Sequence, residues 1–151
     1  MRNSNYQEFL EFAIDNEKEA AALYEKYAGI VASAAQKKLL QEMAAMERAH
    51  EQKLKELARS GMLNLLDGKS TPDLHISDYL VEVEIKQNSP LEDVFVYAMK
   101  AEQKAHELYS MLAEKADDPA IQELFNRLAN EEKKHKYSLE SEYDKGILTE
   151  N

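Results

Sequence analysis

The chain has 151 residues, a formal net charge of −10 from 19 Lys and Arg against 29 Asp and Glu, and no cysteine. This length predicts one domain, residues 1–151, with a buried core. The absence of cysteine excludes disulfides, thiolate metal sites, iron–sulfur clusters and a catalytic thiol. The acidic balance argues against a nucleic-acid partner, because phosphate binding needs clustered Lys and Arg. No apolar run is long enough to span a bilayer, so no membrane partner is expected. The first residues do not resemble a signal peptide, and a cytoplasmic protein is therefore expected.

Two helices are predicted in the first part of the chain, over about 5–32 and 34–60. Gly and Pro are scarce, with 4 and 3 copies, and good helix formers predominate. In both segments apolar residues recur at steps of three and four, which is the period of a helix with one buried face. Ser33 and Gln36 form a capping box at the start of the second helix, and Gly61 stands where a C-terminal cap belongs.

Two further helices are predicted in the second part, over about 90–116 and 119–144, with the same apolar period. The third is announced by Ser89 as its N-cap and Pro90 at the first helical position. The fourth is announced by Asp118, which is followed by a second proline. Short turns join the members of each helix pair, so each pair should form an antiparallel hairpin.

A long connection, over about 62–88, separates the two predicted hairpins. It contains turn residues and one alternating stretch, 79–86, that fits either a short strand or a helical turn. A connection of this length is what two hairpins need to cross the length of a bundle. The sequence therefore predicts an all-α protein, an antiparallel four-helix bundle of two hairpins joined by a long crossover.

An internal repeat relates the two halves of the chain. A shift of 85 residues superposes them without a gap from residue 13 to residue 54. Repeats of long helices usually keep only apolar core positions. Here the repeat also keeps three acidic or histidine positions that lie in the apolar stripes, where burial is expected. These are Glu17/Glu102, Glu47/Glu132 and His50/His135.

The repeated Glu and His residues predict a metal centre. Coincidental charges on solvated faces are the alternative, but carboxylates on core faces are costly unless something compensates them. Glu and His at i and i+3 share one helix face and can bind one ion, so the second and fourth helices offer one pair each. Glu17 and Glu102 can bridge or complete the two ions. Oxygen and imidazole donors without sulfur suit iron, manganese or zinc, and a two-metal carboxylate site favours iron or manganese.

With these residues in place, the chain resembles the rubrerythrin branch of the ferritin-like superfamily. The segments that carry the resemblance are 16–24, 47–50, 101–109 and 132–135, and the likeness extends over about residues 5–144. The resemblance implies a single ferritin-like di-metal domain, a di-iron centre that reacts with hydrogen peroxide or dioxygen, and a homodimer. It also implies roles for particular residues. The metal ligands would be Glu17, Glu47, His50, Glu102, Glu132 and His135, and Tyr24 and Tyr109 would donate hydrogen bonds to ligand carboxylates.

Two departures from the family pattern matter for function. Rubrerythrins proper carry a four-cysteine iron site in a separate domain, so electrons would have to come from a separate electron-donor protein. The peroxidase members have an additional carboxylate one turn after the third-helix ligand, where this chain has Ala105. Glu131 and His106 are spare candidates, although His106 is expected at the surface, and His75 in the connection is expected to have no role.

This site is compatible with two functions of different classes, and a third possibility requires no metal. The leading hypothesis is a redox enzyme, a non-haem di-iron oxidoreductase that reduces peroxide or reacts with dioxygen while Glu residues relay protons. Its catalytic residues would be Glu17, Glu102, Tyr24 and Tyr109. The alternative is a ferroxidase, an iron-handling or storage protein, although residues 145–148 are too few for the short fifth helix typical of storage cages. A metal-free helical interaction module is disfavoured by the Glu and His residues on the core faces.

Overall fold

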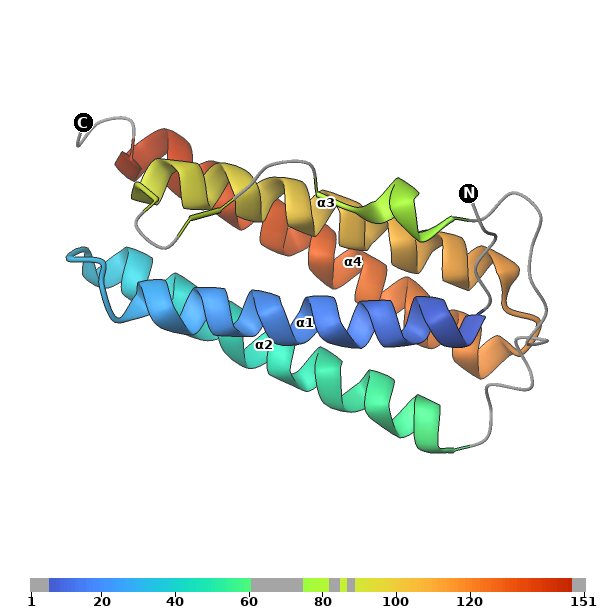
Figure 1. Ribbon diagram of the computed structural model, residues 1–151. Coiled ribbons are helices and arrows are strands. Elements are labelled where there is room, and N and C mark those ends of the chain that lie inside the picture. Colours follow the sequence, from blue (N-terminus) through green and yellow to red (C-terminus); the bar gives the residue numbers. More distant parts are fainter. Residues whose placement is uncertain (1–5, 61–74, 82–84, 87–88, 148–151) are drawn as a thin grey trace. The chain divides into compact units, whose positions relative to one another are not determined.

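Four long α-helices make up most of the described chain (Figure 1). They are α1 (Tyr6–Ala28), α2 (Ala34–Arg59), α3 (Leu91–Lys115) and α4 (Pro119–Glu142). The computed structural model describes residues 6–60, 75–81, 85–86 and 89–147, and none of these residues lies in a strand. The chain divides into two compact units, Met1–Ile76 and Ser77–Asn151, and each unit holds one helix pair.

The first unit contains the hairpin of α1 and α2. The first helix ends at Ala28, before the predicted end at 32, because the backbone turns at Gly29. The N–H groups of Gly29 and Ile30 donate to the carbonyl oxygens of Lys26 and Tyr27, at 3.2 and 3.0 Å. After this turn, Ser33 caps α2, as predicted, since its hydroxyl accepts the N–H of Gln36.

The second unit contains the hairpin of α3 and α4. The predicted cap of α4 is confirmed, because one carboxylate oxygen of Asp118 accepts the N–H groups of the next two non-proline residues at 2.9 and 3.0 Å. The predicted cap of α3 was wrong. Pro90 has φ −59° and ψ 152° and is itself the N-cap. The hydroxyl of Ser89 instead accepts the N–H of Lys86 at 2.9 Å.

Parts of the predicted crossover lie within the described residues. Ile76–Tyr79 forms a short 3-10 helix, and the ammonium group of Lys104 on α3 donates to the carbonyl oxygen of Asp78 at 3.1 Å. The alternating stretch 79–86 begins on the last residue of this helix. Its other described residues have no regular structure, and residues 82–84 are outside the described ranges. Gly61, the predicted cap of α2, also lies outside them.

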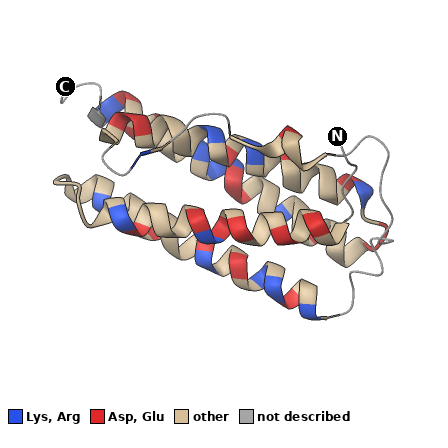
Figure 2. Ribbon diagram, in the orientation of Figure 1, with Lys and Arg blue, Asp and Glu red and all other residues tan. Residues whose placement is uncertain are grey.

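Both hairpins bury an apolar stripe that follows the helical period. The largest fully buried side chains are aromatic and aliphatic, and they include Tyr24, Tyr109, Phe9, Phe95, Phe125, Leu40 and Leu54. Basic and acidic residues lie on all four helices (Figure 2). None of the helices in the described ranges has an apolar stretch long enough to cross a bilayer.

Candidate metal centre

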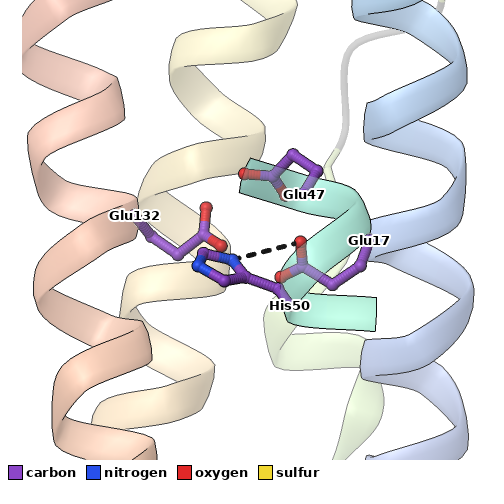
Figure 3. Close-up of side chains that lie close together, drawn as sticks. All are labelled: Glu17, Glu47, His50 and Glu132. Atoms are coloured by element: carbon purple, nitrogen blue, oxygen red, sulfur yellow. Dashed lines mark ion pairs between the residues drawn. The ribbon is translucent and has the colours of Figure 1, made fainter. Parts of the chain in front are cut away.

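The first hairpin brings together three predicted ligands, Glu17 from α1 and Glu47 and His50 from α2. Each of the three side chains is only 2 % exposed. Each offers one ligand atom, and these atoms lie within 4.8 Å of one another. The Nδ1 atom of His50 is 3.5 Å from Oε2 of Glu17, the pair that the dashed line joins in Figure 3. We call these three residues the first triad.

The second hairpin brings together the matching residues, Glu102 from α3 and Glu132 and His135 from α4. Their exposures are 2 %, 1 % and 8 %, and their ligand atoms also lie within 4.8 Å of one another. The Nδ1 atom of His135 is 3.5 Å from Oε2 of Glu102 and 3.9 Å from Oε2 of Glu132. We call these three residues the second triad.

The two triads repeat one geometry. In each hairpin the His follows a Glu by three positions on one helix, so both side chains leave the same helix face. The opposite helix of the hairpin supplies the remaining Glu, and the distance between the imidazole Nδ1 and that Glu is 3.5 Å in both cases. The internal sequence repeat is therefore also a structural repeat. It includes Glu and His side chains, which apolar packing alone would not preserve.

Each triad fits a divalent metal ion. Carboxylate oxygen and imidazole nitrogen atoms bind such ions at about 2.0–2.2 Å. Two ligand atoms of one ion are therefore at most about 4.4 Å apart. The ligand atoms of each triad lie within 4.8 Å of one another, so small side-chain movements would bring them to an ion. Two buried carboxylates beside one imidazole leave negative charge in an apolar interior, which is costly without a cation. A donor set of oxygen and nitrogen without sulfur suits iron, manganese or zinc.

The two predicted hydrogen-bond donors, Tyr24 and Tyr109, are buried, with exposures of 2 % and 1 %. Each lies seven residues after a triad carboxylate on the same helix, which is about two turns. The ring of Tyr109 stacks on Phe125, with centroids 6.2 Å apart. Their role as donors to ligand carboxylates stays a prediction. Tyr27, 5 % exposed, is an ordinary core residue.

The spare candidates lie outside both triads. Ala105, which takes the place of the additional carboxylate, is half-buried, as is Glu131. His106 is half-buried instead of lying at the surface as expected, and its Nδ1 atom is 2.8 Å from the carbonyl oxygen of Ala129. This position allows a contact between α3 and α4 that the helical period alone does not reveal. His75 precedes the 3-10 helix and belongs to neither triad.

An ion-pair network that the sequence reading missed lies beside the first triad. Arg48 donates to both carboxylate oxygens of Glu25, at 2.9 and 3.3 Å, and to Glu51 at 3.1 Å. Lys55 approaches the other oxygen of Glu51 at 2.6 Å. The hydrogen bonds from Arg48 lower the pKa of Glu25. The pKa of the buried Glu51 is also lowered, mainly by the hydrogen bond from Lys55 and less by the one from Arg48. The spacings within α2 could have revealed the part around Glu51, but Glu25 belongs to the other helix.

Comparison with known proteins gives the fold and the family. A structure from Thermotoga maritima, described as that of a ferritin-like diiron-carboxylate protein, matches with a TM-score of 0.78 and 17% identity over 96% of this chain and 98% of that chain. A hypothetical protein from Pyrococcus furiosus matches with a TM-score of 0.71 and 28% identity over 90% of this chain and 86% of that chain. No curated protein sequence matches.

These likenesses show that the chain has the predicted fold, the ferritin-like four-helix bundle. The family model for rubrerythrin matches residues 8–143, which is nearly the whole chain. Family and donor set together indicate a di-metal carboxylate protein. The chain therefore belongs to the rubrerythrin family.

Proposed function

We propose that the protein is a di-iron carboxylate oxidoreductase that reduces hydrogen peroxide or reacts with dioxygen. In this proposal the first and second triads hold two iron ions, and Glu17 and Glu102 bridge or complete them. The observation that carries the proposal is the repetition of one buried Glu–Glu–His geometry in both hairpins. The four carboxylates carry a formal charge of −4, which two divalent ions neutralise.

The side chains of the triads suit proton handling as well as metal binding. Two bound iron ions would supply electrons and polarise the oxygen atoms of the oxidant. Carboxylates such as Glu17 and Glu102 can hold and pass protons to those oxygen atoms. Buried tyrosines, Tyr24 and Tyr109, can donate hydrogen bonds that orient the carboxylates. Burial of all these groups limits the access of bulk water.

Ferroxidase or iron-handling activity is the second candidate. The observation that favours it is Ala105, a half-buried methyl group one turn after Glu102, where peroxidase members of the family have a carboxylate. Without that carboxylate, the centre has only the six ligands of the two triads. Iron would then be the substrate, oxidised at the same site and passed on.

The partners in this proposal follow from the chain's chemistry. The sequence has no cysteine and thus no thiolate iron site that could deliver electrons. We propose that a separate protein supplies them, that the chain forms a homodimer as the family resemblance implies, and that nucleic acid is not a partner of a protein with a net charge of −10.

Metal loading under controlled oxidants tests the proposal. The protein is purified anaerobically, its metal is counted, Fe(II) is added, and the visible spectrum is followed after addition of peroxide or air. Binding of about two ions per chain with faster oxidation by peroxide supports the peroxidase activity. Repeated turnover with iron deposition supports the ferroxidase. Failure to bind iron or manganese contradicts both, and a variant with His50→Ala and His135→Ala is the control for adventitious binding.

A further inference from the structure

The outward side of α4 carries a basic face in a protein that is acidic overall. We define the basic face as Arg127, Asn130, Lys133, Lys134 and Tyr137, all of which are exposed. Tyr137 is a large aromatic residue with 56% exposure. Its ring lies 6.0 Å from the ammonium nitrogen of Lys133.

An acidic group pairs with one end of the basic face. A nitrogen of Arg127 lies 3.6 Å from a carboxylate oxygen of Glu123, one turn earlier on α4. The remaining part, around Lys133, Lys134 and Tyr137, combines two exposed ammonium groups with an aromatic ring. Exposed tyrosines are enriched in protein interfaces, and these two ammonium groups give this part of the face a positive potential that attracts an acidic partner.

The internal repeat supplies a control for this charge pattern. The positions of α2 that match the basic face are Glu42, Ala45, Arg48, Ala49 and Gln52. Their formal charges cancel, whereas those of the basic face sum to +3. Moreover, Arg48 is engaged by two carboxylates of its own hairpin. The basic face is therefore a feature of the second hairpin and not a consequence of the repeat.

The C-terminal part of the basic face lies beside the α4 residues of the second triad in the sequence. Lys134 immediately precedes His135, and Tyr137 follows it by two residues. The imidazole of His135 is buried while the phenol ring of Tyr137 is exposed. Two peptide units thus connect an aromatic group at the surface to a predicted metal ligand. A redox protein bound on this face would lie close to the second triad, and electron transfer is fastest over short distances.

We propose that the basic face is the docking surface for an acidic one-electron carrier protein. The inference rests on the proposed redox function of the triads. Opposite charges would steer the carrier to the face and orient it, and Tyr137 would lie at the centre of the contact. Two carriers each lose one electron, and these electrons, with two protons, reduce one hydrogen peroxide to two water molecules. The carrier is thereby oxidised and the peroxide reduced.

Binding measurements test the docking surface independently of turnover. An acidic plant-type ferredoxin is the probe, and basic cytochrome c is its charge-inverted control. Affinity is measured for the metal-free and the iron-loaded protein at low and high salt. The variant with Lys133→Glu and Lys134→Glu should bind ferredoxin about tenfold or more weakly at low salt, and added salt should weaken the wild-type complex. Cytochrome c should gain affinity in the same variant.

A second variant separates a local effect from the change in net charge. Lys37→Glu with Lys38→Glu alters the net charge equally at two exposed positions of the first hairpin. Equal weakening by both variants, or no binding of ferredoxin to the wild type, overturns the docking surface. Tyr137→Ser should also weaken binding while leaving the charge unchanged.

Turnover of peroxide separates failure of this inference from failure of the proposed function. A small reductant such as ascorbate needs no docking surface, so both lysine variants should keep the wild-type rate with it. With reduced ferredoxin, only Lys133→Glu with Lys134→Glu should lose rate. Absence of turnover with every reductant contradicts the proposed function, and the binding measurements still decide the docking surface. A loss with both ferredoxin and ascorbate assigns the lysines to the metal centre and overturns docking as their role.

Discussion

The Nδ1 atom of His106 lies 2.8 Å from the carbonyl oxygen of Ala129, and this contact links α3 to α4. His106 lies about one turn after Glu102 on α3, and Ala129 lies three residues before Glu132 on α4. A carbonyl oxygen accepts, so Nδ1 carries the proton in this contact. In the first hairpin the position of His106 is taken by Ala21, whose side chain cannot donate. The second triad is therefore supported by an interhelical hydrogen bond that has no equivalent side chain in the first hairpin.

Replacing His106 should destabilise the second hairpin. His106→Ala removes the donor and part of the packing, and we expect the free energy of unfolding of the metal-free protein to fall by about 0.5–1.5 kcal/mol. Urea denaturation measures the change. Asn126→Ala, at an exposed position of α4, is the control and should stay within about 0.5 kcal/mol of the wild type. An unchanged free energy in His106→Ala would mean that the contact contributes nothing to stability.

Each triad should bind its own ion, because each hairpin contributes two carboxylates and one imidazole. We expect His50→Ala to lower the metal content from about two ions per chain to about one, and His135→Ala to do the same. Elemental analysis after anaerobic loading with Fe(II) measures the content. His106→Ala should keep both ions, since His106 belongs to neither triad. Loss of metal in that control would assign His106 to the metal centre.

The composition of the triads could be predicted from the sequence because helix geometry is local. Residues at i and i+3 share a helix face whatever the helix packs against, so Glu47 with His50 and Glu132 with His135 follow from spacing alone. The repeat then identifies Glu17 as the partner in the first hairpin and its counterpart in the second. In the structure the Nδ1 atom of each imidazole lies 3.5 Å from the Glu on the opposite helix of its hairpin, and the role of these residues as metal ligands stays a prediction.

Features that depend on contacts between helices could not be predicted in the same way. The bond of His106 to a backbone carbonyl and the pairing of Arg48 with Glu25 require the register of two helices, which apolar periodicity does not specify. The predicted N-cap of α3 was wrong for a different reason. Ser89 and Pro90 fit the usual sequence pattern of a cap followed by proline, but the hydroxyl of Ser89 accepts the N–H of Lys86 and not an N–H of α3.

Metal binding should stabilise the folded protein by mass action. At a free ion concentration about 100 times the dissociation constant, binding at one site adds about 2.7 kcal/mol. The melting temperature should therefore rise on addition of Fe(II) or Mn(II) under anaerobic conditions. The variant with Glu47→Ala and Glu132→Ala removes one ligand from each triad and should lose this increment. If the increment is unchanged, the ligands are misassigned.

The same carboxylates should destabilise the protein when metal is absent. Each empty triad places two carboxylates beside one imidazole in a buried environment, an excess of negative charge even with the imidazole protonated. Glu47→Gln with Glu132→Gln removes one charge from each triad and nearly keeps the shape. We expect the metal-free variant to be more stable than the metal-free wild type by about 1 kcal/mol per triad. Differential scanning calorimetry in the presence of a chelator measures this, and a loss of stability would show that the charges are compensated within the protein.

The pair of Glu25 and Arg48 predicts a pH-dependent contribution to stability. Hydrogen bonds from Arg48 lower the pKa of Glu25 below its usual value of 4.5. A carboxyl with a lowered folded-state pKa stabilises the protein above its unfolded-state pKa, and that contribution is lost as the pH falls through the folded-state value. Glu25→Gln should therefore be less stable than the wild type at about pH 7, and the difference should shrink towards zero by about pH 3.

Urea denaturation of the metal-free proteins at both pH values measures this difference, with Glu19→Gln on the exposed side of α1 as the matched control. Because Glu25 and Arg48 are exposed, salt should also reduce the effect at neutral pH. If Glu25→Gln differs from the wild type by the same amount at both pH values, the ionised pair is not the source of the difference, and loss of packing at the end of α1 would account for it.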